Sequence, residues 1–122
     1  MFYAVEERDV RRGADRSRVV RLVGAYQQAL AGYLWALGVP RESLEPLLVE
    51  TFVTAPEHRA QRHDLYRVAT RLAARQHGVP LDRCLLVLCC LEGFSYVEAA
   101  RMLELSPAAV RTRVRRAKRR RA

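Results

Sequence analysis

Arginine is concentrated in the final part of the sequence, at spacings that would let one helix read DNA. Basic residues recur every few positions in "PAAVRTRVRRAKRRR", from Pro107 to Arg121. An α-helix with about 3.6 residues per turn would place six side chains on one face or its flanks: Ala108, Arg111, Thr112, Arg115, Arg116 and Arg119. Arginine can donate two hydrogen bonds to guanine or bind phosphates, and small side chains allow close approach to base edges. The pattern therefore predicts these six residues as the DNA-binding face of a helix.

The opposite face of the same helix is apolar and predicts how the helix is held. Val110, Val114 and Ala117 fall in a narrow sector at helical spacing, so we expect them to be buried. Ser106 and Pro107 are typical of an N-cap and a first helical position, so the helix should begin there.

A second helix is predicted immediately upstream. Ser95 and Glu98 fit a capping box, in which each side chain accepts a hydrogen bond from the backbone N–H of the other residue. An apolar face follows, made by Ala99, Met102 and Leu103. Two helices joined by the short break "ELSP" are typical of a helix-turn-helix, which would leave the arginines on the outside of a packed helix.

The charge of the chain is unevenly distributed. The formal net charge is +9, and residues 94–122 alone carry nine basic and two acidic side chains. Such a surface favours an anionic partner, although a run of charge is often only a solvated surface. Three interpretations therefore stand on charge alone: reading of a DNA sequence, a solvated basic tail, or nucleic-acid binding without sequence preference.

Apolar residues repeat at intervals of three and four rather than alternating, so the predicted fold is all-α with about six helices. Before the helix-turn-helix we expect helices over about 15–37, 42–54, 57–76 and 81–91. Two "GVP" sequences, at 38–40 and 78–80, should separate helices because glycine ends a helix and proline prevents its continuation. The prediction is a compact helical bundle with the helix-turn-helix at its carboxyl end.

Catalytic and metal-binding patterns are not found in the sequence. Cys84, Cys89 and Cys90 lie in one apolar run and are interpreted as reduced core thiols, without a histidine pair to complete a zinc site. The isolated His58 and His63 are interpreted as surface residues, so we expect no enzyme activity, no cofactor, no metal and no small-molecule substrate. No apolar segment is long enough for a membrane span or typical of a signal peptide, which predicts a cytoplasmic protein without membrane insertion.

The sequence "LLVLCCLEGFSYVEAARMLELSPAAVRTRVRRAKRR", from Leu85 to Arg120, resembles region 4 of bacterial RNA polymerase sigma factors, especially the extracytoplasmic-function type. The resemblance implies that the last helix reads a minus-35 promoter element, with Arg111, Thr112, Arg115 and Arg116 at DNA-contacting positions. LuxR-type regulators have a similar helix-turn-helix, but the arginine-rich ending is closer to that of sigma factors. Glu104 replaces the usual turn glycine, and a left-handed conformation there should cost about 1 kcal/mol.

Upstream segments resemble sigma region 2 in a shortened and degenerate form. "LEPLLVETFVTA" is similar to the segment that docks on polymerase, which implies a polymerase-binding role for Leu44, Leu47, Leu48, Glu50 and Thr51. "DLYRVATRLAARQ" is similar to the segment that opens and reads the minus-10 element, but Asp64 replaces a tryptophan and Arg71 replaces an asparagine. Flipped bases need stacking surfaces, so these departures argue against strand separation.

The resemblance implies a region 2-like domain over residues 1–77 and a region 4-like DNA-binding domain over residues 78–122. The predicted function is that of a sigma factor-like transcription regulator, whose partners in transcription initiation are promoter DNA, core RNA polymerase and an anti-sigma factor. The alternative is a sigma mimic that binds an anti-sigma factor or polymerase without promoter melting.

Overall fold

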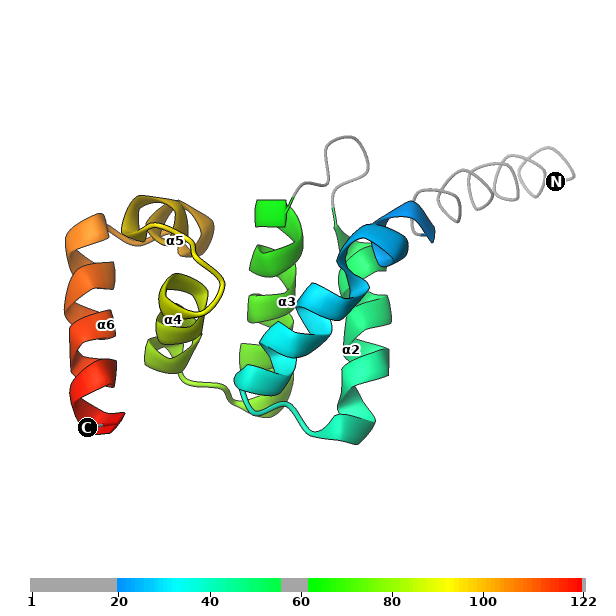
Figure 1. Cartoon of the computed structure of the whole chain (residues 1–122), viewed down its shortest axis with the longest axis horizontal. Helices are drawn as coiled ribbons and strands as arrows, with labels where there is room; N and C mark the ends of the chain where they lie inside the picture. The colour runs from blue at the N-terminus through cyan, green and yellow to red at the C-terminus, as the bar shows by residue number, and fades with distance from the viewer. Residues whose placement is uncertain (1–19, 56–61, 122) are drawn as a thin grey trace, which may run out of the picture.

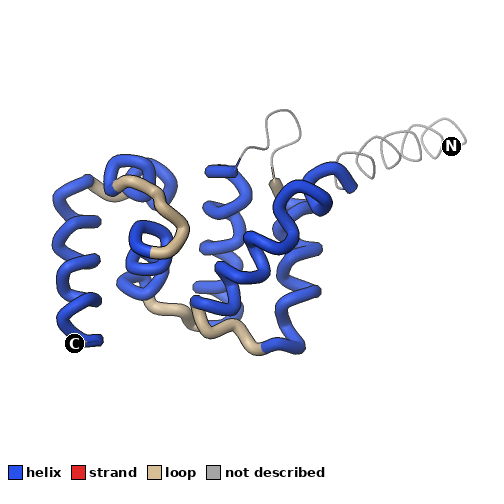
Figure 2. The backbone as a smooth tube through the Cα atoms, viewed as in Figure 1, coloured by secondary structure: helices blue, strands red, loops and turns tan. Residues whose placement is uncertain are grey.

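The computed structural model describes residues 20–55 and 62–121, and it is built from helices alone in these ranges. A helix over residues 20–36 is followed by α2 (Arg41–Thr54), α3 (Arg62–His77), α4 (Leu81–Cys90), α5 (Tyr96–Leu103) and α6 (Pro107–Arg121) (Figures 1 and 2). The all-α prediction with about six helices is therefore confirmed. The expected starts of the first and third helices, at residues 15 and 57, lie outside the described residues.

Both "GVP" sequences are turns between helices, as predicted. Gly38 and Gly78 have φ angles of 94° and 63°, in the left-handed region that favours glycine. Pro40 and Pro80 follow in extended conformation as the N-cap residues of α2 and α4. Each turn thus ends one helix and immediately sets the direction of the next.

Local capping signals fix both helices of the helix-turn-helix. The capping box of α5 is complete: the Glu98 backbone N–H donates to Ser95 Oγ at 3.0 Å, and the Ser95 N–H donates to Glu98 Oε1 at 2.9 Å. The hydroxyl of Ser106 accepts from the Ala109 N–H at 3.1 Å at the start of α6. Glu104 caps the carboxyl end of α5 in the left-handed conformation, with φ 57° and ψ 46°. The turn between α5 and α6 therefore keeps its left-handed residue although this residue is Glu104 and not glycine, at a strain of about 1 kcal/mol.

One apolar core joins the N-terminal helices to α4, and we call it the bundle core. Its buried members include Leu30, Tyr33, Leu34, Leu37, Leu47, Phe52, Leu65, Tyr66, Ala69, Cys84, Val87, Leu88, Phe94 and Met102. The hydroxyls of Tyr33 and Thr70 are 2.6 Å apart, and Thr70 donates its proton to the carbonyl of Tyr66. The buried Tyr33 hydroxyl is therefore the donor of this pair, and both hydroxyls have hydrogen-bond partners inside the core.

A second, smaller core lies under the helix-turn-helix, and we call it the motif core. It contains Leu85, Leu86, Ala99, Ala100, Val110, Val114 and Ala117. Helix α4 contributes to both cores, because Cys84, Val87 and Leu88 belong to the bundle core while Leu85 and Leu86 belong to the motif core. The helix-turn-helix is thus packed on the N-terminal helices through α4 and also through α5, which contributes Met102 to the bundle core, and Figure 1 shows α4 and α5 between α3 and α6.

The three cysteines differ in burial, which corrects their interpretation as a set of core thiols. Cys84 is buried, Cys89 is partly buried and Cys90 is exposed; all three are free thiols. Burial raises the pKa of Cys84 and of Cys89 to about 11. Cys90 belongs to the same apolar run of the sequence, but it is exposed because it lies in the last turn of α4, beyond the part of the helix that either core covers.

No helix within residues 20–55 and 62–121 combines the length and apolar character needed to cross a bilayer. In the same ranges no three His, Cys, Asp or Glu side chains are grouped so that they could hold a metal ion.

Candidate nucleic-acid interface

The outer face of α6 carries the side chains that the sequence proposes for DNA. Ala108, Arg111, Thr112, Arg115 and Arg119 are all exposed. On the other side Val110 and Val114 are fully buried and Ala117 is 6% exposed, against α4 and α5. The predicted packing of this helix is confirmed: its inner face is buried against α4 and α5, and its outer face points to solvent.

The N-terminal half of the outer face is small and weakly polar. The Thr112 hydroxyl donates to the carbonyl of Ala108 at 3.0 Å. In this rotamer the Thr112 oxygen can accept a hydrogen bond but has no proton to donate, and its methyl group is free for an apolar contact. Ala108 and Thr112 together leave room for a base edge to approach the helix, beside the longer reach of Arg111 and Arg115.

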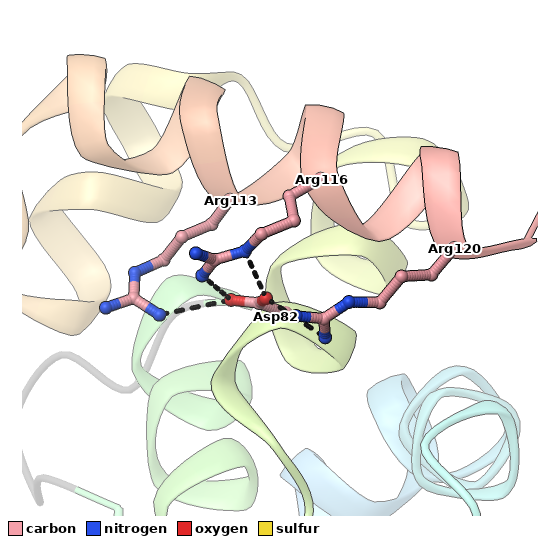
Figure 3. Close-up of polar contacts among 4 residues, drawn as sticks. All are labelled: Asp82, Arg113, Arg116 and Arg120. Carbon is pink, nitrogen blue, oxygen red and sulfur yellow. Dashed lines mark hydrogen bonds and ion pairs between the residues drawn. The ribbon is translucent and has the colours of Figure 1, made fainter.

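Three other arginines of α6 converge on one carboxylate of α4, and we call this group the Asp82 cluster (Figure 3). Arg116 donates from Nε to Asp82 Oδ2 at 3.0 Å and from a terminal nitrogen to Oδ1 at 3.2 Å. Arg113 donates to Oδ1 at 3.1 Å, and Arg120 lies 3.5 Å from Oδ2. The two hydrogen bonds from Arg116 and the single one from Arg113 lower the pKa of Asp82, so the carboxylate stays charged.

Arg116 is paired with Asp82 and is not a free cation on the surface of α6. Arg116 was predicted to contact DNA, and in this structure its guanidinium is engaged by Asp82. A role at DNA for Arg116 therefore remains a prediction, in competition with this pair. The sequence did not single out Asp82, because its partners lie 31 and 34 residues away and no local spacing links them.

Helix α5 is tied to α3 through its own cap. His63 Nε2 lies 2.7 Å from Glu98 Oε2. The Ser95 N–H, followed by His63 and the Ser95 hydroxyl, lowers the pKa of Glu98 to about 2. His63 is exposed, as expected for a surface residue, but it also packs edge-on against the Phe94 ring. His58 lies outside the described residues.

Further contacts hold α3 to the segment that leads into α5. The Arg62 guanidinium lies 3.9 Å from the centroid of the Phe94 ring and donates to the carbonyl of Glu92. The Tyr66 hydroxyl donates to the Glu92 carboxylate at 3.0 Å. Arg71 lies 3.6 Å from the Glu104 carboxylate. Helix α3 therefore contacts both the helix-turn-helix and the segment that leads into it.

The residues predicted to bind polymerase lie largely in the bundle core. Leu47, Leu48 and Thr51 are buried, with exposures of 1%, 8% and 0%, so they cannot form an exposed docking surface. Leu44 is partly buried against the bundle core. Glu50 alone is well exposed, and its carboxylate accepts a hydrogen bond from Gln76 at 2.8 Å.

The exposed apolar side chains of α2 lie on a different face from those predicted. Val49 and Val53 are 55% and 61% exposed. Together with the exposed Glu45 and Pro46 they lie on one side of the helix, and we call these four residues the α2 stripe. The spacing of the two valines was visible in the sequence, but Leu44, Leu47 and Leu48 formed an equally good apolar face.

The comparisons with known proteins concern the helix-turn-helix. Residues 80–120 match the family model described as Sigma-70, region 4. Searches of curated proteins and of solved structures gave no match for the chain. The family match covers α4, α5 and nearly all of α6, about a third of the chain, and it includes the outer face, the motif core and the Asp82 cluster. It does not extend to residues 1–79.

Proposed function

We propose, from the premise that residues 80–120 are a sigma-70 region 4 domain, that the chain binds a minus-35-type promoter element through α6 in transcription initiation. The observation that carries this proposal is the division of α6 into two faces. Buried Val110 and Val114 fix the helix to its support, while Thr112 and Arg115 remain exposed on the outer side. A helix supported in this way can enter a major groove with its outer face toward the base edges.

The outer face also divides along its length. Thr112 and Arg115 lie in the middle of α6, next to the small Ala108, where approach to base edges is closest. Arg119 lies one turn further toward the carboxyl end and is exposed. We assign Thr112 and Arg115 to base edges and Arg119 to the phosphate backbone, with Arg111 at the edge of the reading face.

Arg115→Ala and Thr112→Ala are each expected to weaken binding to the preferred site by about 1 to 3 kcal/mol, because each removes a contact to a base edge. Binding to scrambled DNA should change much less. Arg119→Ala should weaken binding to the preferred site and to scrambled DNA alike, and it should reduce the slope of log affinity against log salt by about one unit. Competition binding on a selected promoter fragment and on scrambled DNA, at several salt concentrations, measures both quantities.

Arg115→Lys is the matched control, because it keeps the charge but not the planar, two-donor guanidinium. If Arg115 reads a base, this variant should lose preference while keeping its salt slope. If every substitution lowers the affinity for promoter and scrambled DNA equally, Thr112 and Arg115 do not contact base edges, and the chain binds nucleic acid without sequence preference.

For core polymerase, we propose that the docking surface is the α2 stripe and not the buried Leu47, Leu48 and Thr51. Its support is the pair of exposed valines, which have no apolar cover in the described part of the chain. Val49→Asp combined with Val53→Asp should abolish retention of core polymerase in a pull-down, because two carboxylates would have to be desolvated on docking. Val20→Asp is the control, since Val20 is similarly exposed at 64% on another helix. Equal retention of core polymerase by the double variant and by the Val20→Asp control would show that the α2 stripe is not the docking surface.

A sigma mimic is the second candidate, and the packing of α3 favours it. Arg71 forms an ion pair with Glu104 of the helix-turn-helix at 3.6 Å, so a carboxylate competes with DNA phosphates for this arginine. A mimic would bind an anti-sigma factor or core polymerase without promoter melting. Retention of either protein by a chain that shows no preference among DNA sequences would support this candidate over promoter reading.

A further inference from the structure

The Asp82 cluster contains more positive charge than its function as a packing contact requires. Three guanidinium groups meet one carboxylate, which leaves an excess of two positive charges. The guanidinium groups also carry many more N–H donors than two carboxylate oxygens can accept. The three arginine side chains keep contact with solvent while the carboxylate has little: Arg113, Arg116 and Arg120 are 37%, 46% and 65% exposed, and Asp82 is 10% exposed.

The position of the cluster on α6 matters for any bound duplex. Arg113, Arg116 and Arg120 occupy one flank of the helix, roughly 60 to 120° around from the centre of the outer face. A helix lying in a major groove has a phosphate backbone along each of its flanks. The cluster therefore lies where α6 would pass a DNA backbone. A space of about 260 Å³ beside it is lined in part by Asp82, Arg83 and Arg120, and is large enough to admit a phosphate group.

The three arginines are held with different strength. Arg116 forms two hydrogen bonds to Asp82 and Arg113 forms one, whereas Arg120 makes only an ion pair at 3.5 Å and is the most exposed. A carboxylate that accepts hydrogen bonds from guanidinium groups offers the same chemistry as a phosphodiester oxygen. Asp82 and a backbone phosphate would therefore compete for the same guanidinium groups.

We propose that Asp82 determines DNA specificity by acting as an internal substitute for a DNA phosphate, which occupies Arg113, Arg116 and Arg120 and withholds them from the backbone. This inference rests on the proposed DNA binding of α6. Backbone contacts strengthen binding to every sequence equally, so withholding them raises the relative weight of the base contacts made by Thr112 and Arg115. Asp82 touches no base and acts only through the arginines.

The adjacent residues Arg119 and Arg120 provide a matched test in the otherwise unchanged chain. Arg119 has no ion pair with any described residue, whereas Arg120 is paired with Asp82. On random-sequence duplex, Arg119→Gln should reduce the salt slope by about 0.9, the value for one lost phosphate contact, and Arg120→Gln should reduce it by less than half as much. Equal losses would show that Asp82 does not withhold Arg120, and would overturn the inference.

Asp82→Asn provides the second arm, because it removes the competing charge with little change in shape. Its affinity for random duplex should rise roughly five-fold per freed arginine at physiological salt, and its salt slope should steepen by about 0.9 for each. Arg120→Gln in this background should then match Arg119→Gln. Asp82→Glu, which keeps the carboxylate, should return the slope toward that of the unmodified chain.

The outcomes separate this inference from the proposed function. If Asp82 only positions α6, then Asp82→Asn should weaken binding to promoter and random DNA together, and the inference is overturned while promoter reading stands. If the unmodified chain binds no DNA, both proposals fail. If Asp82→Asn does not fold, as judged by circular dichroism, the comparison of Arg119→Gln with Arg120→Gln decides the question alone.

Discussion

Val110→Asp is expected to abolish the folded helix-turn-helix. Val110 has no exposed surface and lies at the centre of the motif core, among Leu85, Leu86, Ala99 and Ala100. A carboxylate there would be buried with no cation or donor beside it, at a cost of about 3 to 5 kcal/mol. A small domain has a total stability of roughly 5 to 15 kcal/mol, so this single change should remove much of it.

Loss of helical circular dichroism, or a fall in the melting temperature of 10 °C or more, measures the effect of Val110→Asp, since 1 kcal/mol corresponds to roughly 4 to 8 °C in a domain of this size. Ala108→Asp is the control: it introduces the same charge two residues earlier, on the exposed outer face in the first turn of α6. A negative charge near a helix N-terminus is mildly favourable, so its melt should match that of the unmodified chain. Equal melts for both variants would refute the assigned packing of α6.

Phe94→Ala is expected to separate the helix-turn-helix from the N-terminal helices, at a cost of about 3 to 5 kcal/mol. The Phe94 side chain is 2% exposed and belongs to the bundle core, although it lies between α4 and α5. Its ring packs against Tyr66 and His63 at centroid distances of 5.2 and 5.3 Å, and Arg62 lies over its face. Removing the ring leaves a cavity in the bundle core and deprives Arg62 of its cation–π partner.

Hydrogen exchange distinguishes a loss of coupling from general destabilisation. In Phe94→Ala, α5 and α6 should lose protection at a lower denaturant concentration than the helix over residues 20–36, whereas the unmodified chain should open as one unit. Leu91→Ala removes a large apolar side chain that is 69% exposed, three residues earlier, and should leave the exchange pattern unchanged. A single cooperative transition in Phe94→Ala, with the stability of the unmodified chain, would contradict this role for Phe94.

The features that could be predicted from sequence are those set by neighbouring residues. The caps at Ser95 and Ser106 depend on contacts three residues apart, and both are formed as expected. The two sides of α6 could be assigned because only one of them is apolar. The left-handed turn at Glu104 followed from the resemblance, since the position of the turn was recognisable without its glycine.

The features that escaped prediction depend on contacts between distant parts of the chain. Helix α2 has apolar residues around much of its surface, so the sequence alone could not tell which ones the neighbouring helices would cover. Leu47 and Leu48 were covered and Val49 and Val53 were not. The attachment of Arg116 to Asp82 likewise depends on how α6 crosses α4, which no local pattern reports.

The contribution of α4 to both cores determines the orientation of α6 relative to α2 and α3, in addition to holding them in contact. Because α4 contributes to both the bundle core and the motif core, a rotation of α6 in a groove would be expected to move α2 and α3 with it. A protein bound to the α2 stripe would then be held at a fixed angular position around the axis of the DNA duplex. Moving the recognised element by about 5 base pairs, half a helical turn, would carry that partner to the opposite side of the DNA. The rotational phase of a promoter element, and not only its sequence, would then decide whether a second protein could be reached.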